Sequence, residues 1–301
     1  MTQALKFEKS QTAEAAAPIL LRDGAKIQTW VHPGNGTPLV FLHGLGSSTS
    51  HWKYQLAHAQ SMKRLTIHLD YRGHGISTLG DALRPLTITT LSHDLREVLD
   101  QLSIETSVIL GQSMGGTIAL QFAHDHPNRC AGLVIQGAAG RNPYATMSIG
   151  DSGRAAIKMM IGLNKISPKW ARMMNKAASH APLVMRELIR RNRFNPALAR
   201  NEEIENYIQH FFATNPNLFY ELAEDLQDFD ISKMDHLINV PALIIAGALD
   251  KMVPLDECKW LAKRLPQAEL EIIAHGSHCP QMDDPTYVNQ RIHRFLETYH
   301  F

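Results

Sequence analysis

The chain has 301 residues, of which 44% are hydrophobic and 20% charged, so it is long enough and apolar enough to bury a sizeable core. Its formal net charge of +1 argues against nucleic acid or an anionic membrane surface as a partner, because both favour a strong basic excess. The sequence has no apolar run of the ~18 residues that a membrane span needs, and its three cysteines form no C-x-x-C pair and no disulfide framework. The 16 histidines are scattered, without the spacing of a zinc motif, so neither a metal nor a cofactor is predicted.

The N-terminal stretch, residues 1–18, is expected to be a flexible tail. It mixes charged residues with alanines, follows no period and lacks the long apolar core of a signal peptide. We therefore expect a cytoplasmic protein, either a monomer or a homodimer.

Strands and helices alternate through the first part of the chain. The helical pattern at 87–102 carries its leucines and Val98 on one face, and a second helical pattern follows residue 113. The expected strands are short apolar or alternating runs, at 25–33, 38–44, 64–70, 107–112 and 131–137. Alternation of this kind predicts an α/β fold with a mostly parallel sheet and helices on both faces.

Alternation stops at about residue 141, and residues 141–229 contain only helical patterns. Strands return at 241–247 and 269–273, each followed by a helical pattern. The sequence therefore predicts a core domain made of residues 19–140 and 230–301, with a helical segment inserted between its two parts.

Ser113 lies between two glycines, in G-Q-S-M-G, where an apolar strand gives way to a helical pattern. This arrangement is typical of a nucleophile elbow, in which a strained turn projects the serine hydroxyl out of the sheet. Gly111 and Gly115 fit because a side chain at either position would meet the neighbouring strand or helix. The alternative is a small residue at an ordinary tight turn, and the choice depends on whether an acid, a base and an anion site accompany Ser113.

An anion site is expected in the loop that follows the strand 38–44. The loop opens with a His-Gly pair, and its backbone N–H groups can point at a developing negative charge. The expected donors are the N–H groups of Leu45 and Met114, the latter being the residue after Ser113. His43 is expected to brace the loop, and an ordinary turn after a strand is the alternative interpretation.

The expected acid is Asp250, which follows the strand 241–247 at the edge of the sheet where functional groups of parallel sheets gather. Its alternative role is to cap the next helix or to pair with Lys251. The expected base is His278, which follows a Gly-Ser pair in the loop after the strand 269–273, whereas His275 is expected to be structural.

The order Ser113, Asp250, His278 and five loop motifs resemble the α/β-hydrolase superfamily over about residues 19–300. The motifs are H-G-L-G (43–46), D-Y-R-G-H-G-I-S (70–77), G-Q-S-M-G-G (111–116), G-A-L-D-K-M-V-P (247–254) and G-S-H-C-P-Q-M-D-D-P (276–285). The resemblance implies an eight-stranded, mostly parallel sheet, with residues 141–229 as a helical cap, or lid, over the active site. It also implies a structural role for Arg72 and His74. Epoxide hydrolases and haloalkane dehalogenases of the superfamily carry aspartate at the position of Ser113, so the serine argues against both activities.

The substrate pocket is expected to be apolar. Flexible methionines adapt to varied ligands, and the inserted segment is rich in them. The expected lining residues are Val253 beside the acid, Met159 and Met160 in the insertion, and Trp52 and Trp170 as an aromatic wall. For the methionines, ordinary helix core is the alternative. The basic run R-E-L-I-R-R-N-R (186–193) is expected to be a solvated helix face, with binding of an anionic substrate group as the alternative.

The sequence therefore predicts a serine hydrolase that cleaves carboxylic esters of small to medium apolar acyl groups through an acyl-enzyme. One alternative uses the same three residues to hydrolyse carbon–carbon bonds or enol-lactones of aromatic breakdown, and it requires a cationic group in the cavity to hold a carboxylate. Another is a non-catalytic ligand receptor on a hydrolase scaffold, in which Ser113 would be idle.

Overall fold

The computed structural model describes residues 18–81, 85–167, 169–170, 173 and 182–301. Residues 1–17, which make up nearly all of the predicted tail, lie outside the described residues. None of the helices in the described part of the chain combines the length and the apolar character that a membrane span requires. The cytoplasmic location and the monomeric or homodimeric state stay predictions.

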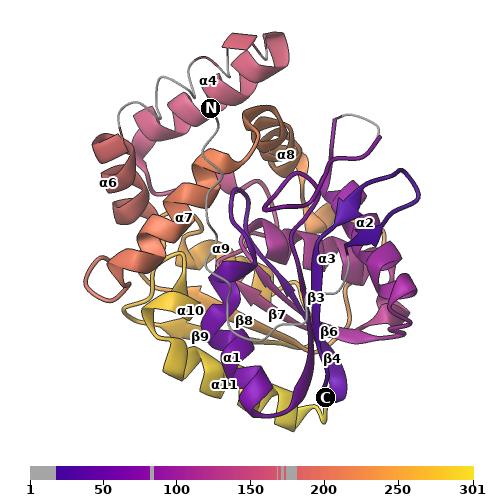
Figure 1. Ribbon diagram of the computed structural model, residues 1–301. Helices are drawn as coiled ribbons and strands as arrows, with labels where there is room; N and C mark the ends of the chain where they lie inside the picture. The colour runs from indigo at the N-terminus through magenta and orange to yellow at the C-terminus, as the bar shows by residue number, and fades with distance from the viewer. Residues whose placement is uncertain (1–17, 82–84, 168, 171–172, 174–181) are drawn as a thin grey trace.

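A seven-stranded sheet forms the centre of the molecule (Figure 1). Its order is β3-β5-β4-β6-β7-β8-β9; β3 runs antiparallel to β5, and the other neighbours are parallel. The strands are β3 (Thr29–His32), β4 (Asn35–Leu42), β5 (Arg64–Leu69), β6 (Ser107–Gln112), β7 (Cys130–Gln136), β8 (Ala242–Gly247) and β9 (Ala268–Ile273). The predicted mostly parallel sheet is confirmed, with seven strands described where eight were expected.

The expected strand at 25–33 is divided at Gln28. Residues before it form β2 (Lys26–Ile27), which pairs with β1 (Ile19–Leu20) in a separate two-stranded sheet, and residues after it form β3. The main chain of Gln28 accepts a hydrogen bond from the N–H of Asp70 and donates to the hydroxyl of Ser77. These bonds to the loop after β5 separate the two strands.

Helices cover both faces of the sheet. Successive residues of a strand point to opposite faces, so each central strand contributes side chains to both layers. On one face, Leu39 and Phe41 of β4 pack with α1 (Lys53–Ser61) and α11 (Pro285–Thr298). On the other face, Val40 and Leu42 belong to a larger cluster with α2 (Ile88–Gln101), α3 (Met114–Asp125) and α9 (Leu255–Ala262). Both faces of the central strands are therefore buried, as expected from their continuous apolar runs.

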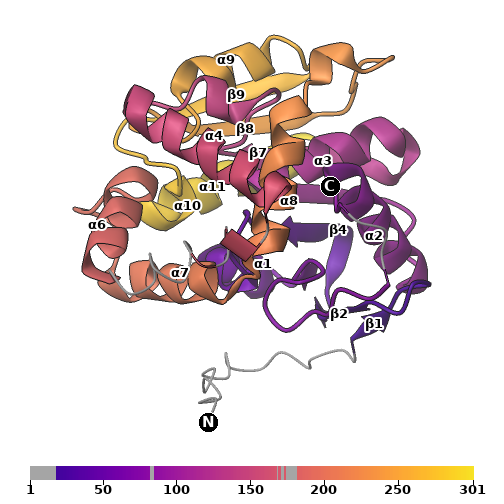
Figure 2. The ribbon, with the colours of Figure 1, turned by 90° about the horizontal axis from the view of Figure 1, so that it is seen from above.

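Residues 141–229 lie between β7 and β8 and are called the insertion segment below. Its described helices are η3 (Pro143–Ala145), α4 (Gly150–Ile166), α6 (Pro182–Arg193), α7 (Asn201–Ala213) and α8 (Pro216–Asp228). These α-helices lie together at the top and upper left of Figure 1 and spread across the view from above in Figure 2. Phe211 and Phe219 approach Gly46, just after β4, and the main-chain oxygen of Arg193 accepts a hydrogen bond from Ser277, after β9. The insertion segment therefore lies against loops at the carboxyl ends of the strands.

Candidate active site

Ser113 occupies a sharp turn between β6 and α3. Its backbone φ is 54° and ψ is −123°, a strained conformation for a residue with a side chain. The turn is crowded: a Cβ at Gly111 would lie 2.4 Å from the carbonyl oxygen of Gly115, and one at Gly115 would lie 2.3 Å from the oxygen of Leu42. Only glycine fits at these two positions, and this crowding explains the spacing of the sequence motif.

His278 and Asp250 meet Ser113 from two other loops. The Nε2 atom of His278 lies 3.1 Å from the Oγ of Ser113, and its Nδ1 atom lies 2.9 Å from the Oδ2 of Asp250. Ser113 follows β6, Asp250 follows β8, and His278 lies in the loop after β9, so three strands of the parallel part of the sheet supply the three side chains at their carboxyl ends. The structure thus brings together the three residues singled out in the sequence.

Backbone groups hold Asp250 in place. Its second oxygen, Oδ1, accepts hydrogen bonds from the N–H groups of Met252 (2.7 Å) and Val253 (2.9 Å). Asp250 and His278 are 6% and 1% exposed. A buried carboxylate with both oxygens occupied fixes the orientation of the imidazole and makes Nδ1–H the hydrogen-bond donor.

The loop that carries His278 is fixed on both sides. The amide of Gln112, the residue before Ser113, donates to the main-chain oxygen of His278 at 3.1 Å. Asp283 accepts hydrogen bonds from both the N–H and the hydroxyl of Ser277 at 2.6 Å. His275, by contrast, pairs with Asp284 on the exposed side of the loop. The loop therefore presents His278, and not His275, to Ser113.

The loop after β4 lies directly against Ser113. A Cβ on Gly44 would come within 3.2 Å of the Cβ of Ser113 and 2.5 Å of the side-chain oxygen of Gln112. Met114 is the first residue of α3, so its N–H belongs to the first turn, which has no intrahelical acceptor. Leu45 follows Gly44 and is buried. Their role as anion donors stays a prediction.

Behind this loop, His43, Asp70 and His74 form a buried brace. The Nε2 atom of His74 accepts a hydrogen bond from the N–H of Gly46, and Asp70 accepts one from the N–H of Thr49 at 3.0 Å. Burial raises the pKa of Asp70 to about 6 and lowers that of His74 to about 4. Near neutral pH, His74 is therefore uncharged and able to accept, consistent with the structural role expected of this stretch.

His51 is a buried residue beside the site that no sequence signal marked. Its ring stacks on Tyr207 of the insertion segment, with centroids 5.0 Å apart, and lies near His278. Burial, followed by the charge of Arg193, lowers its pKa to about 3. His51 therefore presents a neutral imidazole between the core and the insertion segment.

The basic run at 186–193 divides into two parts. Arg186, Arg190 and Arg191 pair with glutamates on the helices α6 and α7, as expected for a solvated face. Arg193 instead stacks its guanidinium over the ring of Tyr207 at 5.3 Å, and its charge acts on the buried side chains of His51, Tyr144 and Cys279. The expected solvated face does not describe Arg193. The alternative interpretation, that the run binds an anionic substrate group, is the one that would give Arg193 a functional role.

The predicted aromatic wall at Trp52 is wrong. Trp52 is fully buried in the cluster between the sheet, α1 and α11, where its ring meets Phe41 edge-on at 5.5 Å. It therefore has no surface to offer a ligand. The sequence could not separate these cases, because an aromatic residue at the start of a helix fits either a pocket or a core.

The other predicted pocket residues differ in exposure. Val253 is buried and holds Asp250 through its N–H. Met159 on α4 is 59% exposed and Trp170, just beyond α4, is 56% exposed, while Met160 is partly buried. The described residues therefore do not enclose Met159 and Trp170 in a pocket, and contact of these residues with a substrate stays a prediction.

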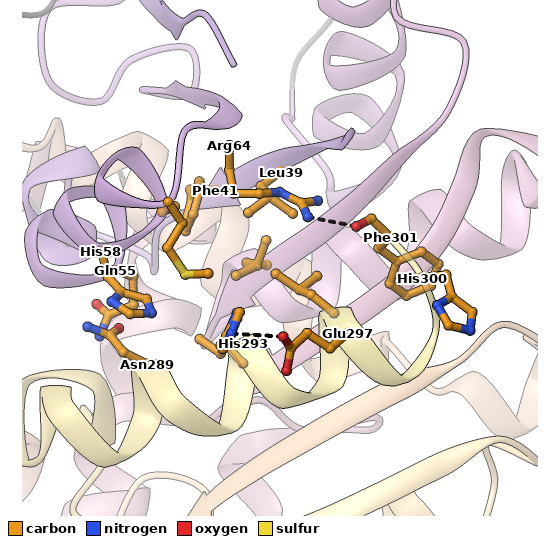
Figure 3. A pocket seen from close by; sticks show the side chains of 15 residues that line it. Leu39, Phe41, Gln55, His58, Arg64, Asn289, His293, Glu297, His300 and Phe301 are labelled. Carbon is orange, nitrogen blue, oxygen red and sulfur yellow. Dashed lines mark hydrogen bonds and ion pairs between the residues drawn. The ribbon is translucent and has the colours of Figure 1, made fainter. Parts of the chain in front are cut away.

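A cavity of about 430 Å³ lies elsewhere, between α1 and α11 (Figure 3). Its floor is apolar, with Leu39 and Phe41 of β4, and its rim carries His58, Arg64 and His293. Ser113, Asp250 and His278 are not among its lining residues, so this cavity is separate from the site that they form.

Comparison with known proteins agrees with this architecture. A family model described as the alpha/beta hydrolase fold matches residues 37–285. A 2-hydroxy-6-oxononadienedioate/2-hydroxy-6-oxononatrienedioate hydrolase of Paraburkholderia phymatum is 30% identical over 268 residues, which cover 86% of each chain.

Two solved structures show the same fold. A thermophilic esterase from Thermogutta terrifontis has a TM-score of 0.72 at 22% identity, covering 96% of this chain and all of that one. An enol-lactonase from Burkholderia xenovorans LB400 has a TM-score of 0.72 at 21% identity, covering 91% of this chain and 97% of that one. With the family match over most of its length, this chain belongs to the alpha/beta hydrolase fold family, and it is a hydrolase.

Proposed function

We propose that this protein is a serine hydrolase that cleaves carboxylic esters of small to medium apolar acyl groups through an acyl-enzyme. The observation that carries the proposal is the chain of contacts from the hydroxyl of Ser113 through the imidazole of His278 to the carboxylate of Asp250. A free serine hydroxyl is a poor nucleophile at neutral pH, and a hydrogen-bonded imidazole makes it competent.

In the first half of the reaction, Nε2 of His278 takes the proton of Ser113 as Oγ attacks the ester carbonyl. Asp250 stabilises the imidazolium that results, because its buried carboxylate already accepts the Nδ1–H group. The imidazolium then protonates the departing alcohol, and the acyl group stays on Ser113. In the second half, water takes the place of the alcohol and His278 activates it in the same way.

Two backbone amides, those of Leu45 and Met114, would hold the negative charge of the tetrahedral intermediate. The close approach of Gly44 to Ser113 supports this role, since it brings the loop after β4 next to the reacting atom. Each such donor contributes ~3 kcal/mol to lowering the barrier. The insertion segment would act as the cap over this site and shape the acyl pocket.

The direct test is hydrolysis of p-nitrophenyl esters of increasing acyl length. We expect turnover with short and medium chains, and a loss in Ser113→Ala that leaves only the roughly 10³-fold acceleration of the remaining groups. Turnover that persists in full in a folded Ser113→Ala variant would refute the proposal. If the wild-type protein hydrolyses none of the esters, the proposed substrate class is refuted.

Arg193 favours a second candidate, a carbon–carbon or enol-lactone hydrolase. Such a substrate carries a carboxylate, and the relative from Paraburkholderia phymatum is named for a dienedioate. Arg193 is the kind of cation that this reaction requires: it extends from the insertion segment toward Tyr207, His51 and the loop of His278. The same three residues, Ser113, His278 and Asp250, would serve both reactions.

Arg193→Met separates the two candidates. In a carbon–carbon hydrolase, the variant should lose at least tenfold in kcat/KM for a dienoate diketone while keeping its activity on a neutral p-nitrophenyl ester. In an ester hydrolase of apolar substrates, Arg193 would hold no part of the substrate. The variant should then change less than tenfold in kcat/KM for both the dienoate diketone and the p-nitrophenyl ester. Arg191→Met, at the exposed position two residues earlier, is the matched control.

A further inference from the structure

Four polar side chains meet at the surface beyond the far end of α3. His124 and Asp125 end this helix, and Asp235 and His236 lie in the stretch between η4 (Ile231–Lys233) and β8. The imidazoles of the two histidines stack at 4.2 Å between centroids, with 18° between their planes. The Nε2 atom of His124 and the Nδ1 atom of His236 both face Oδ1 of Asp235, at 2.9 and 2.7 Å.

Each imidazole has its other nitrogen on an acceptor as well. The Nδ1 atom of His124 lies 3.0 Å from the carboxylate of Asp125, and the Nε2 atom of His236 lies 3.0 Å from the main-chain oxygen of His124. Carboxylate and carbonyl oxygens only accept hydrogen bonds, so all four ring nitrogens face acceptors. A neutral imidazole donates through one nitrogen only, so in two neutral rings one lone pair of each ring is directed at an oxygen that cannot donate.

We propose that His124, Asp235 and His236 bind a divalent transition-metal ion of the zinc class, through Nε2, a carboxylate oxygen and Nδ1. The three ligand atoms lie within 4.8 Å of one another. A cation among them would turn the two opposed lone pairs into ligand bonds and leave each ring with one N–H for its outer acceptor. Two imidazoles and one carboxylate suit zinc, with water completing the coordination.

The outer partners of the site support this assignment. Metal-bound histidines donate their second N–H group to a carboxylate or a backbone carbonyl, which fixes the tautomer and the ring orientation. Asp125 and the carbonyl of His124 occupy these two positions, and the amide of Gln121 in turn donates to both oxygens of Asp125, at 2.9 and 3.0 Å.

The distances require only a small adjustment. Neighbouring ligands of a tetrahedral zinc ion with bonds of 2.0–2.1 Å lie about 3.3 Å apart, slightly farther than the present separations from Asp235. The side chain of Asp235 is 84% exposed and can make this shift, while His124 is held by its helix.

The proposed ion would join two elements that are distant in the sequence. The helix α3 begins immediately after Ser113 and extends 12 residues, about 18 Å, to Asp125, the residue after His124. Asp235 and His236 belong to the stretch that returns from the insertion segment to the core. The ion would therefore tie α3 to this return stretch and stabilise the fold, without touching the reacting atoms.

The test is zinc binding by the full-length protein without a histidine tag, stripped with a chelator and titrated with zinc sulfate. We expect one zinc ion per wild-type chain at this site and a rise in Tm when zinc is added. His236→Ala should weaken binding at least tenfold and abolish the rise, and Asp125→Asn should weaken binding 10- to 100-fold by releasing the ring of His124. The matched control is His93→Ala, which removes an exposed histidine from the neighbouring helix α2 and should bind zinc as the wild type does.

Two results would overturn the proposal. One is a wild-type protein that neither binds zinc nor gains thermal stability from it, which would leave the cluster as two histidines hydrogen-bonded to carboxylates. The other is equal zinc binding by the wild type, His236→Ala and Asp125→Asn, which would locate the ion elsewhere. Ester hydrolysis by Ser113 is a separate readout, and we expect all three variants to retain it.

Discussion

Gly137 controls how closely Asp250 and His278 can approach each other. It follows β7, has a φ of 51°, and a Cβ placed on it would lie 2.9 Å from the main-chain oxygen of His278 and 3.3 Å from Oδ2 of Asp250. Two separate requirements therefore exclude a side chain: the left-handed backbone and the contact with the two residues behind Ser113.

Gly137→Ala should reduce kcat about 100-fold or more, since a displacement of about 1 Å in the site has that effect. The control is Gly24→Ala, whose φ of 81° imposes the same backbone strain but whose Cβ would meet nothing within 4 Å. Backbone strain should cost each variant about 1 kcal/mol of stability, measured by urea denaturation, and Gly137→Ala should lose more because its Cβ also meets the main-chain oxygen of His278. Only Gly137→Ala should lose activity. Equal activities in the two variants would contradict the importance of this contact.

At the scale of single residues, the sequence predicted the functional side chains whose position is determined by a turn or by the end of a strand. Ser113, Asp250 and His278 follow three strands, and the structure brings them within hydrogen-bond distance. The sequence did not identify His51. It also predicted Trp52 in the pocket, whereas this side chain packs in the core, because the direction of a side chain depends on tertiary contacts.

Arg72 connects elements at the edge of the core. Its guanidinium binds both oxygens of Asp94 on α2, at 2.6 and 2.5 Å, Oδ2 of Asp23 at 2.6 Å and the main-chain oxygen of Leu79 at 2.8 Å. The side chain of Arg72 is only 3% exposed, and that of Asp94 is 13% exposed. One buried cation thus holds the β1–β2 segment, the loop after β5 and α2 together.

Arg72→Met should lower the free energy of unfolding by about 3–5 kcal/mol, because it leaves the Asp94 carboxylate largely buried and unpaired. Arg96→Met is the comparison: it breaks an exposed pair with Asp100 on the same helix and should cost no more than about 0.5 kcal/mol. Urea denaturation of the three proteins measures both values. Similar losses in the two variants would show that burial of the Arg72 pair is unimportant.

At the scale of elements, periodicity predicted the central strands and the helices α2 and α11 well. These elements bury a continuous apolar run or one apolar face, and both patterns are visible in the sequence. The division of the expected strand at Gln28 was not predicted, because it depends on hydrogen bonds to Asp70 and Ser77, about 40 to 50 residues away.

The stability of the whole molecule should depend on pH through His68. This residue of β5 stacks on Trp30, with centroids 5.0 Å apart, and burial, with a smaller contribution from His32, lowers its pKa to about 3. Its unfolded pKa is about 6.5, so below that pH the unfolded state binds a proton that the folded state does not. The free energy of unfolding therefore falls as the pH falls from about 6.5 toward 3, by up to about 1.4 kcal/mol per pH unit.

His68→Phe keeps an aromatic ring in the stack and removes this titration. The stability difference between the variant and the wild type should therefore move in favour of the variant as the pH falls from 7 to about 4.5. Urea denaturation at several pH values measures it, with His93→Phe at an exposed position of α2 as the control. A difference that stays constant over this range would contradict a neutral, buried His68.

At the scale of the molecule, the fold class followed from strand–helix alternation, and residues 141–229 were expected to interrupt it with helices alone. The described part of this segment is mainly helical and packs near the loop after β4 and the loop that carries His278. The shape of the substrate pocket did not follow from the sequence, because it depends on how the helices of the insertion segment lie against those loops.

The account rests on an activated hydroxyl at Ser113, and labelling with a fluorophosphonate probe tests it most directly. We expect one adduct per chain, located on Ser113 by peptide mass spectrometry, absent in Ser113→Ala and at least 100-fold slower to form in His278→Ala. Circular dichroism should show that both variants are folded. A wild-type protein that does not react, or a rate of labelling that is the same in His278→Ala, would contradict the account.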